Sequence, residues 1–106
     1  MDNFRIIYKI LKILEVALDY EEFNPADSIT AKSLNVSDAR FYALIMMMQA
    51  EGYIKGVVQG GTVVNAITDI SGMRITLKGL DYLHENTLMK KMARTAKGIK
   101  ETIPGL

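Results

Sequence analysis

The 106-residue sequence contains no cysteine and only one histidine, His84. Without cysteine the chain cannot form a disulfide, a thiolate metal site or a cysteine nucleophile, and this composition suits a reducing cytoplasm. No apolar run approaches the roughly 18 residues that cross a bilayer. Asp2, Arg5 and Lys9 interrupt any early signal-peptide core. We therefore expect a cytoplasmic protein with no membrane partner.

Recognisable catalytic patterns are missing as well. His84 has no potential metal ligands at the required spacing, and we find no Ser-His-acid set and no paired-carboxylate site. Gly60-Gly61 is too short to be a phosphate-binding loop. We expect no enzymatic activity, no metal, no cofactor and no small-molecule ligand.

The chain is rich in apolar residues, at 49%, and its net charge is only +1. Together with its length, this composition predicts one folded domain and argues against disorder. The charge is uneven, however. Residues 1–51 hold five basic and eight acidic side chains, whereas residues 52–106 hold eight basic and four acidic ones. If the protein binds a polyanion, the second half of the chain should supply most of the contacts.

Apolar residues at helical spacing predict most of the chain to be helical. The predicted helices cover residues 3–20, 30–34, 38–51, 77–86 and 88–101. Asn35-Val36-Ser37 is expected to form a turn in which Ser37 caps the following helix, and Gly52 is expected to end that helix. The pair 28–29 is compatible with a very short strand.

The spacing then changes from that of a helix to that of strands. β-branched and aromatic runs over 53–59 and 62–68, separated by Gly60-Gly61, predict a hairpin. Two helices joined by a short turn and followed by a hairpin and a helix give the winged-helix order. We predict an α+β, mainly helical fold: a winged helix-turn-helix with a β-hairpin wing over residues 1–87, and a C-terminal helical extension over 88–106.

The helix predicted over 3–20 is apolar around most of its circumference. The stripe expected to face the core consists of Phe4, Ile7, Leu11, Leu14 and Leu18. The flanking positions Ile6, Ile10, Ile13 and Ala17 are apolar too. Such a helix needs cover on more than one side, either from a later helix or from a second subunit.

Three stretches of the sequence resemble the small YjcQ-type bacterial and prophage proteins. They are IIYKILKILE near the start, AEGYIKGV at the end of the 38–51 helix, and ITLKGLDYLHEN over residues 75–86. The last two are also similar to the wing and following helix of MarR- and PadR-type transcription regulators. The resemblance implies a fold like that of winged-helix DNA-binding proteins.

In a winged helix, the 38–51 helix would be the one that reads DNA. Its expected core positions are Phe41, Leu44, Ile45 and Met48. The candidate DNA contacts on and before its outer face are Ser37, Ala39, Arg40, Tyr42, Ala43 and Gln49. Arginine and glutamine match the hydrogen-bonding edges of bases, and serine can serve phosphates. Asp38 and Glu51 oppose phosphate, and the alternative is a helix surface that packs against protein.

The hairpin supplies further candidate contacts at its tip. These are Gln59, Gly60, Gly61 and Thr62, whose main-chain N–H groups could touch a phosphate backbone. The tip has no arginine or lysine, so an ordinary solvent-exposed turn is the alternative reading.

Methionine is frequent, and three methionines stand together at 46–48. We expect Met48 to face inward, Met47 to lie at the border as core filling, and Met46 to face outward as a partner contact. The C-terminal helix has an apolar stripe that includes Met89, Met92, Ala96 and Ile99. Residues 88–100 also carry five basic side chains and no acidic one. In order of preference, this stripe docks on the first helix, pairs in a homodimer, or lies on an anionic membrane.

These patterns support two functional hypotheses. In the first, the protein is a homodimeric DNA-binding regulator of transcription, associated with a prophage, that inserts the 38–51 helix into the major groove of duplex DNA. In the second, the winged helix is a protein-interaction module, and Tyr42, Ala43 and Met46 meet a partner chain.

Overall fold

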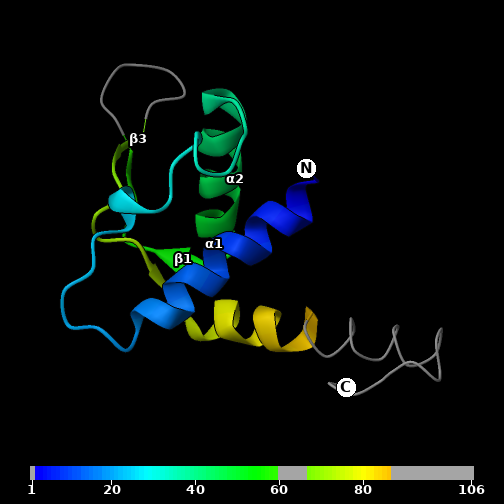
Figure 1. The fold of residues 1–106 in the computed structure, drawn as a ribbon. Coiled ribbons are helices and arrows are strands. Elements are labelled where there is room, and N and C mark those ends of the chain that lie inside the picture. Colours follow the sequence, from blue (N-terminus) through cyan, green and yellow to red (C-terminus); the bar gives the residue numbers. More distant parts are fainter. Residues whose placement is uncertain (1, 60–66, 87–106) are drawn as a thin grey trace, which may run out of the picture.

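A computed structural model describes residues 2–59 and 67–86 of the chain (Figure 1). The elements in order are α1 (Asn3–Ala17), the 3-10 helix η1 (Pro25–Asp27), α2 (Asp38–Ala50), β1 (Ile54–Lys55), β2 (Val58–Gln59), β3 (Ile67–Asp69) and β4 (Arg74–Ile75). Residues 77–86 are also helical. The predicted α+β, mainly helical fold class is confirmed, and the layout is consistent with a winged helix.

Helix α1 buries Leu11 and Leu14 as predicted, but its buried face is rotated toward the flanking apolar positions. Asp2 caps it by accepting a hydrogen bond from the Arg5 amide at 2.9 Å. Its buried positions are Ile6, Ile10, Leu11, Leu14 and Ala17. Phe4 is 71% exposed and Leu18, just beyond the end of the helix, is 56% exposed, so both predictions were wrong. Because α1 is apolar on most sides, its contacts with α2 and β4 decide which side is buried.

The segment between α1 and α2 is less regular than predicted. Residues 28–29 form no strand, and residues 30–34 form hydrogen-bonded turns in place of a helix. The Leu34 amide donates to the Thr30 carbonyl at 3.1 Å, and Thr30 and Ser33 cap each other's amides. A stretch this short gains too few hydrogen bonds to nucleate an α-helix. It still buries Ile29 and Leu34 in the core.

Helix α2 follows the prediction closely. Ser37 caps it by accepting a hydrogen bond from the Arg40 amide at 3.1 Å. Leu44, Ile45 and Met48 are buried, as expected. Gly52 ends the helix with a φ of +86°, a conformation that glycine adopts without steric cost.

The hairpin consists of two short antiparallel strand pairs along the same two arms. Strand β1 pairs with β4, and β2 pairs with β3. The predicted continuous strand over 53–59 was wrong because Gly56, at a φ of +88°, separates β1 from β2. A Cβ atom on Gly56 would lie only 2.0 Å from the Gly72 carbonyl oxygen, so the two arms approach each other closely here. The corner at Gly60-Gly61 lies outside the described residues.

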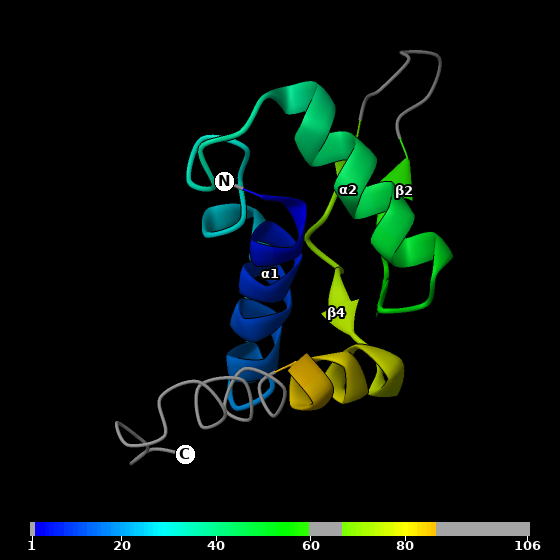
Figure 2. The same cartoon turned by 90° about the vertical axis from the view of Figure 1, so that its right-hand side faces the viewer.

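Residues 77–86 place a third helix against α1, as Figures 1 and 2 show. Thr76 begins this helix: its hydroxyl oxygen accepts from the Gly79 amide and its hydroxyl hydrogen is donated to the Gly52 carbonyl. Leu83 is buried and Leu80 is half-buried, as predicted. A later helix therefore supplies part of the cover that α1 requires. The core lies between this helix, α1, α2 and the strands.

Candidate nucleic-acid interface

The N-terminal half of α2 presents an exposed face of small side chains with one cation. Ser37, Ala39, Arg40 and Ala43 are all exposed. The Arg40 guanidinium donates to the Asn3 side-chain oxygen at 3.2 Å, which is an exposed contact between α2 and α1. Small residues let a helix approach another surface closely, and the surface hydrogen bond of Arg40 costs little to exchange for another acceptor.

The first link between α2 and the hairpin joins Tyr42 to Gln59. The Gln59 side-chain amide donates to the Tyr42 hydroxyl oxygen at 2.8 Å. Tyr42 is half-buried, whereas Gln59 is exposed on strand β2. Two residues that were predicted as separate DNA contacts are therefore brought together. The bond leaves the Tyr42 hydroxyl hydrogen to be donated to another acceptor.

The second link is formed by Gln49, which lies about two helical turns after Tyr42 in α2. Its side-chain oxygen accepts from the Val57 amide at 2.8 Å, and its side-chain nitrogen donates to the Val57 carbonyl at 3.3 Å. Val57 lies between β1 and β2, and the Gln49 side chain bonds its N–H and C=O groups as a neighbouring strand would. Gln49 was expected on the outer face of the helix, but it is half-buried and engaged by the backbone. The structure gives it a positioning role between α2 and the hairpin.

The methionine cluster is rotated relative to the prediction. Met48 is buried as expected, but Met46 is half-buried against the core and Met47 is 54% exposed. The predicted orientations of Met46 and Met47 were therefore wrong. Positions 46 and 47 differ by about 100° around the helix axis, and α1 leaves the side with Met47 open.

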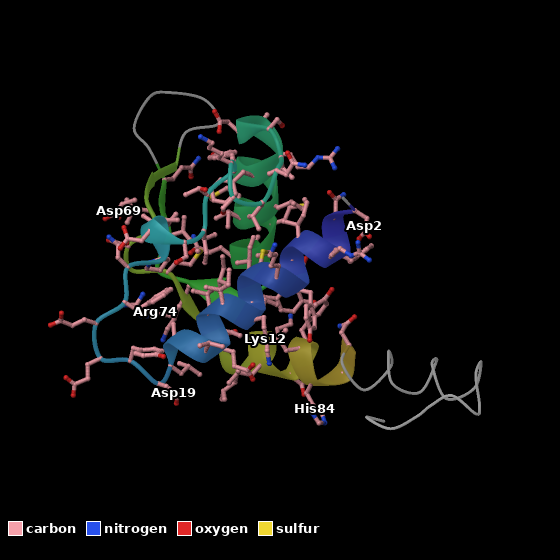
Figure 3. The ribbon with its side chains drawn as sticks, in the orientation of Figure 1. Asp2, Lys12, Asp19, Asp69, Arg74 and His84 are labelled. Carbon is pink, nitrogen blue, oxygen red and sulfur yellow. The ribbon has the colours of Figure 1, made fainter. Side chains whose placement is uncertain are left out.

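The charges around α2 and the hairpin are mixed. Lys32 and Arg40 are exposed near the start of α2, but so is Asp38. Arg74, at the base of the hairpin, donates to three carbonyl oxygens, those of Ser71, Met73 and Phe23. Arg74 therefore ties the hairpin to the segment after α1, near which it lies in Figure 3.

Ionisable groups with perturbed pKa values have structural partners. The side chain and amide of Ser71 hydrogen-bond Asp69 and lower the pKa of its carboxyl group. The Glu15 carboxylate, 2.8 Å away, raises the pKa of Lys12. Burial, followed by the neighbouring Tyr53, raises the pKa of Tyr82. Asp69 and Lys12 are exposed and lie apart in Figure 3, so these shifts do not mark a catalytic cluster.

Some predicted site residues lie outside the described part of the chain. At the hairpin tip these are Gly60, Gly61 and Thr62, and in the C-terminal extension they are Met89, Met92, Ala96 and Ile99. Within residues 2–59 and 67–86, no group of three His, Asp or Glu residues is arranged to hold a metal ion. Nor does any helix in those two ranges have the length and apolar character needed to cross a membrane.

An apolar groove between α1 and α2 was not predicted. It has a volume of about 250 Å³. Its lining residues are Asn3, Phe4, Ile7, Leu44, Met47, Met48, Glu51 and Tyr53. The exposed side chains of Phe4 and Met47 belong to it. The sequence signal for this groove was the excess of apolar residues on α1, but the pattern alone did not say which side would remain open.

Comparison with known proteins gives one match. A family model described as YjcQ protein matches residues 8–102, which is nearly the whole chain. No curated protein and no solved structure matches this sequence.

Proposed function

This chain belongs to the YjcQ family, and from that premise we propose that it binds duplex DNA as a winged-helix protein. Helix α2 enters the major groove, and the hairpin contacts the backbone beside it. The protein acts as a regulator of transcription, works as a homodimer and is associated with a prophage. It uses no cofactor and has no enzymatic activity.

The observation that carries this proposal is the double link between α2 and the hairpin. The Tyr42–Gln59 bond and the Gln49–Val57 pair fix β2 beside the helix. In Figure 2, β2 lies directly alongside α2. A winged helix needs this fixed relation, because helix and wing contact neighbouring parts of one duplex.

Each exposed residue on this face has a definite part in the proposal. Arg40 exchanges its bond to Asn3 for the edge of a guanine or for a phosphate. The Tyr42 hydroxyl donates its hydrogen to a phosphate oxygen while it continues to accept from Gln59. Ala39 and Ala43 allow the helix backbone to approach the floor of the groove. The basic residues of 52–106 supply sequence-independent attraction.

Fluorescence anisotropy with a labelled duplex at about 50 mM salt tests this proposal. The protein should bind in the micromolar range, and Arg40→Ala should weaken binding roughly tenfold and reduce the salt slope by about one. Lys9→Ala is the matched control, since Lys9 is an exposed cation on α1. The absence of binding at tens of micromolar protein, or equal losses for both variants, would refute the proposal.

The rival hypothesis, a protein-interaction module, uses the patch of Tyr42, Ala43 and Met46. The structure weakens that patch, because Tyr42 is bonded to Gln59 and Met46 packs against the core. Under this hypothesis, Tyr42→Asp lowers the molecular mass measured by light scattering, whereas Arg40→Ala leaves it unchanged. An unchanged mass for Tyr42→Asp counts against the rival.

A further inference from the structure

The groove between α1 and α2 is lined mainly by apolar side chains. Phe4, in the first turn of α1, is 71% exposed, and Met47 of α2 is 54% exposed. Both side chains line this groove, with Ile7, Leu44 and Tyr53 also contributing to its walls. Exposed apolar side chains gathered around one groove are typical of a contact surface.

The last described residue lies beside this groove. Asn86, the last described residue, lines a second pocket together with Phe4, Arg5 and Tyr8. Phe4 is therefore shared by both pockets. Asn86 therefore lies near one end of the apolar groove, and 20 residues follow it in the sequence.

The sequence of that remaining segment complements the groove. Met89, Met92, Ala96 and Ile99 recur at alternating spacings of three and four, which is the spacing of one helix face. The opposite positions are basic, and residues 88–100 contain no acidic residue.

We propose that the apolar stripe of residues 89–99 docks in the groove between α1 and α2 of the same chain. Its methionines cover Phe4 and Met47, and its basic face points to solvent. The same chain is the favoured source because Asn86 already lies beside Phe4. A tether of only a few residues keeps the segment at a high effective concentration, which a second copy lacks in dilute solution.

Disulfide trapping tests this docking without competing disulfides, because the natural chain has no cysteine. The full-length Met47→Cys/Met92→Cys variant is oxidised at low micromolar concentration and analysed by non-reducing electrophoresis and mass spectrometry. The matched control is Met47→Cys/Lys91→Cys, since Lys91 lies about 100° around a helix from Met92 and off the apolar stripe. We expect an intramolecular disulfide that forms roughly tenfold faster than in the control.

A second measurement does not require a disulfide to form. In full-length Met47→Cys, the single thiol should react with a small alkylating reagent several-fold more slowly than in the same variant with Met92→Asp added. Adding Lys91→Asp should leave the rate unchanged, because the proposed docking turns that position toward solvent. Dimers linked by disulfides would overturn the proposal in favour of a second copy. Equal trapping rates for both pairs, or alkylation unaffected by Met92→Asp, would overturn docking in the groove altogether.

Discussion

Gln49 offers the sharpest test of how the hairpin is held against α2. The substitution Gln49→Leu keeps a side chain of similar size but removes both hydrogen bonds to Val57, at 2.8 and 3.3 Å. Val57 is only 9% exposed, so water cannot readily replace the lost partners of its N–H and C=O groups. The perturbation therefore acts on two buried backbone groups at one residue.

The expected loss follows from these two groups. One hydrogen bond contributes about 0.5–1.5 kcal/mol net to the free energy of unfolding. Leaving a buried N–H or C=O group without a hydrogen-bond partner costs more. We expect the free energy of unfolding to fall by about 2–3 kcal/mol. With a urea dependence of about 1 kcal/mol per molar, the unfolding midpoint should drop by roughly 2–3 M.

Urea unfolding followed by circular dichroism measures this change, and amide hydrogen exchange localises it. Relative to the natural chain, Gln49→Leu should accelerate exchange of the Val57 amide more than exchange of the amides in α1. Tyr42→Phe is the matched control, because it removes the hydroxyl that accepts from the exposed Gln59 and should cost under about 0.5 kcal/mol. If Gln49→Leu is no less stable than Tyr42→Phe, then Gln49 does not hold the hairpin. Under the DNA-binding proposal, Gln49→Leu should also weaken binding to duplex DNA.

Gly56, Thr76 and Asp2 are further positions at which the structure sets the expected outcome. Gly56→Ala should cost about 3 kcal/mol, because its Cβ would meet the Gly72 carbonyl at a φ of +88°. Gly72→Ala, whose nearest contact is 3.3 Å, should melt at a clearly higher temperature, and equal melting temperatures would contradict the close approach. Thr76→Val removes a helix cap and a bond to a carbonyl, so urea unfolding should show a loss of about 1–2 kcal/mol, and no measurable loss would contradict that role. The Arg5 amide lowers the pKa of Asp2 from 3.8, so the stabilisation by Asp2 is present above that pH and is lost as the pH falls below it. The difference in urea midpoint between the natural chain and Asp2→Ala should shrink from about pH 7 to about pH 2.5, and a constant difference would refute the cap.

The features of α2 that depend on near neighbours could be predicted from the sequence. The Ser37 cap, the Gly52 terminus and the buried positions Leu44, Ile45 and Met48 were all confirmed. A cap requires only a suitable side chain three residues before the amide that it binds, and a clean apolar stripe leaves one choice of buried face. The exposed positions Ala39, Arg40 and Ala43 follow directly from that choice.

Predictions failed where the local pattern allowed more than one arrangement. Residues 30–34 have helical spacing but are too few to form a helix, so they remain turns. The run over 53–59 looks like one strand, but the contact of Gly56 with Gly72, a residue 16 positions away, breaks it into two. Gln49 was expected on the outer face of α2 because nothing in the sequence identifies Val57 as its hydrogen-bond partner.

The sequence by itself determined that this chain forms a mainly helical α+β domain, where α2 begins and ends, and that a hairpin follows it. Caps, apolar spacing and turn residues act over a few positions, and their effects can therefore be predicted from the local sequence. Only the tertiary structure decided which side of α1 is buried, that Met47 and not Met46 is exposed, and that α1 and α2 leave a groove beside Phe4. These features arise from contacts between distant segments, whose packing selects one face of a helix that is apolar on nearly every side.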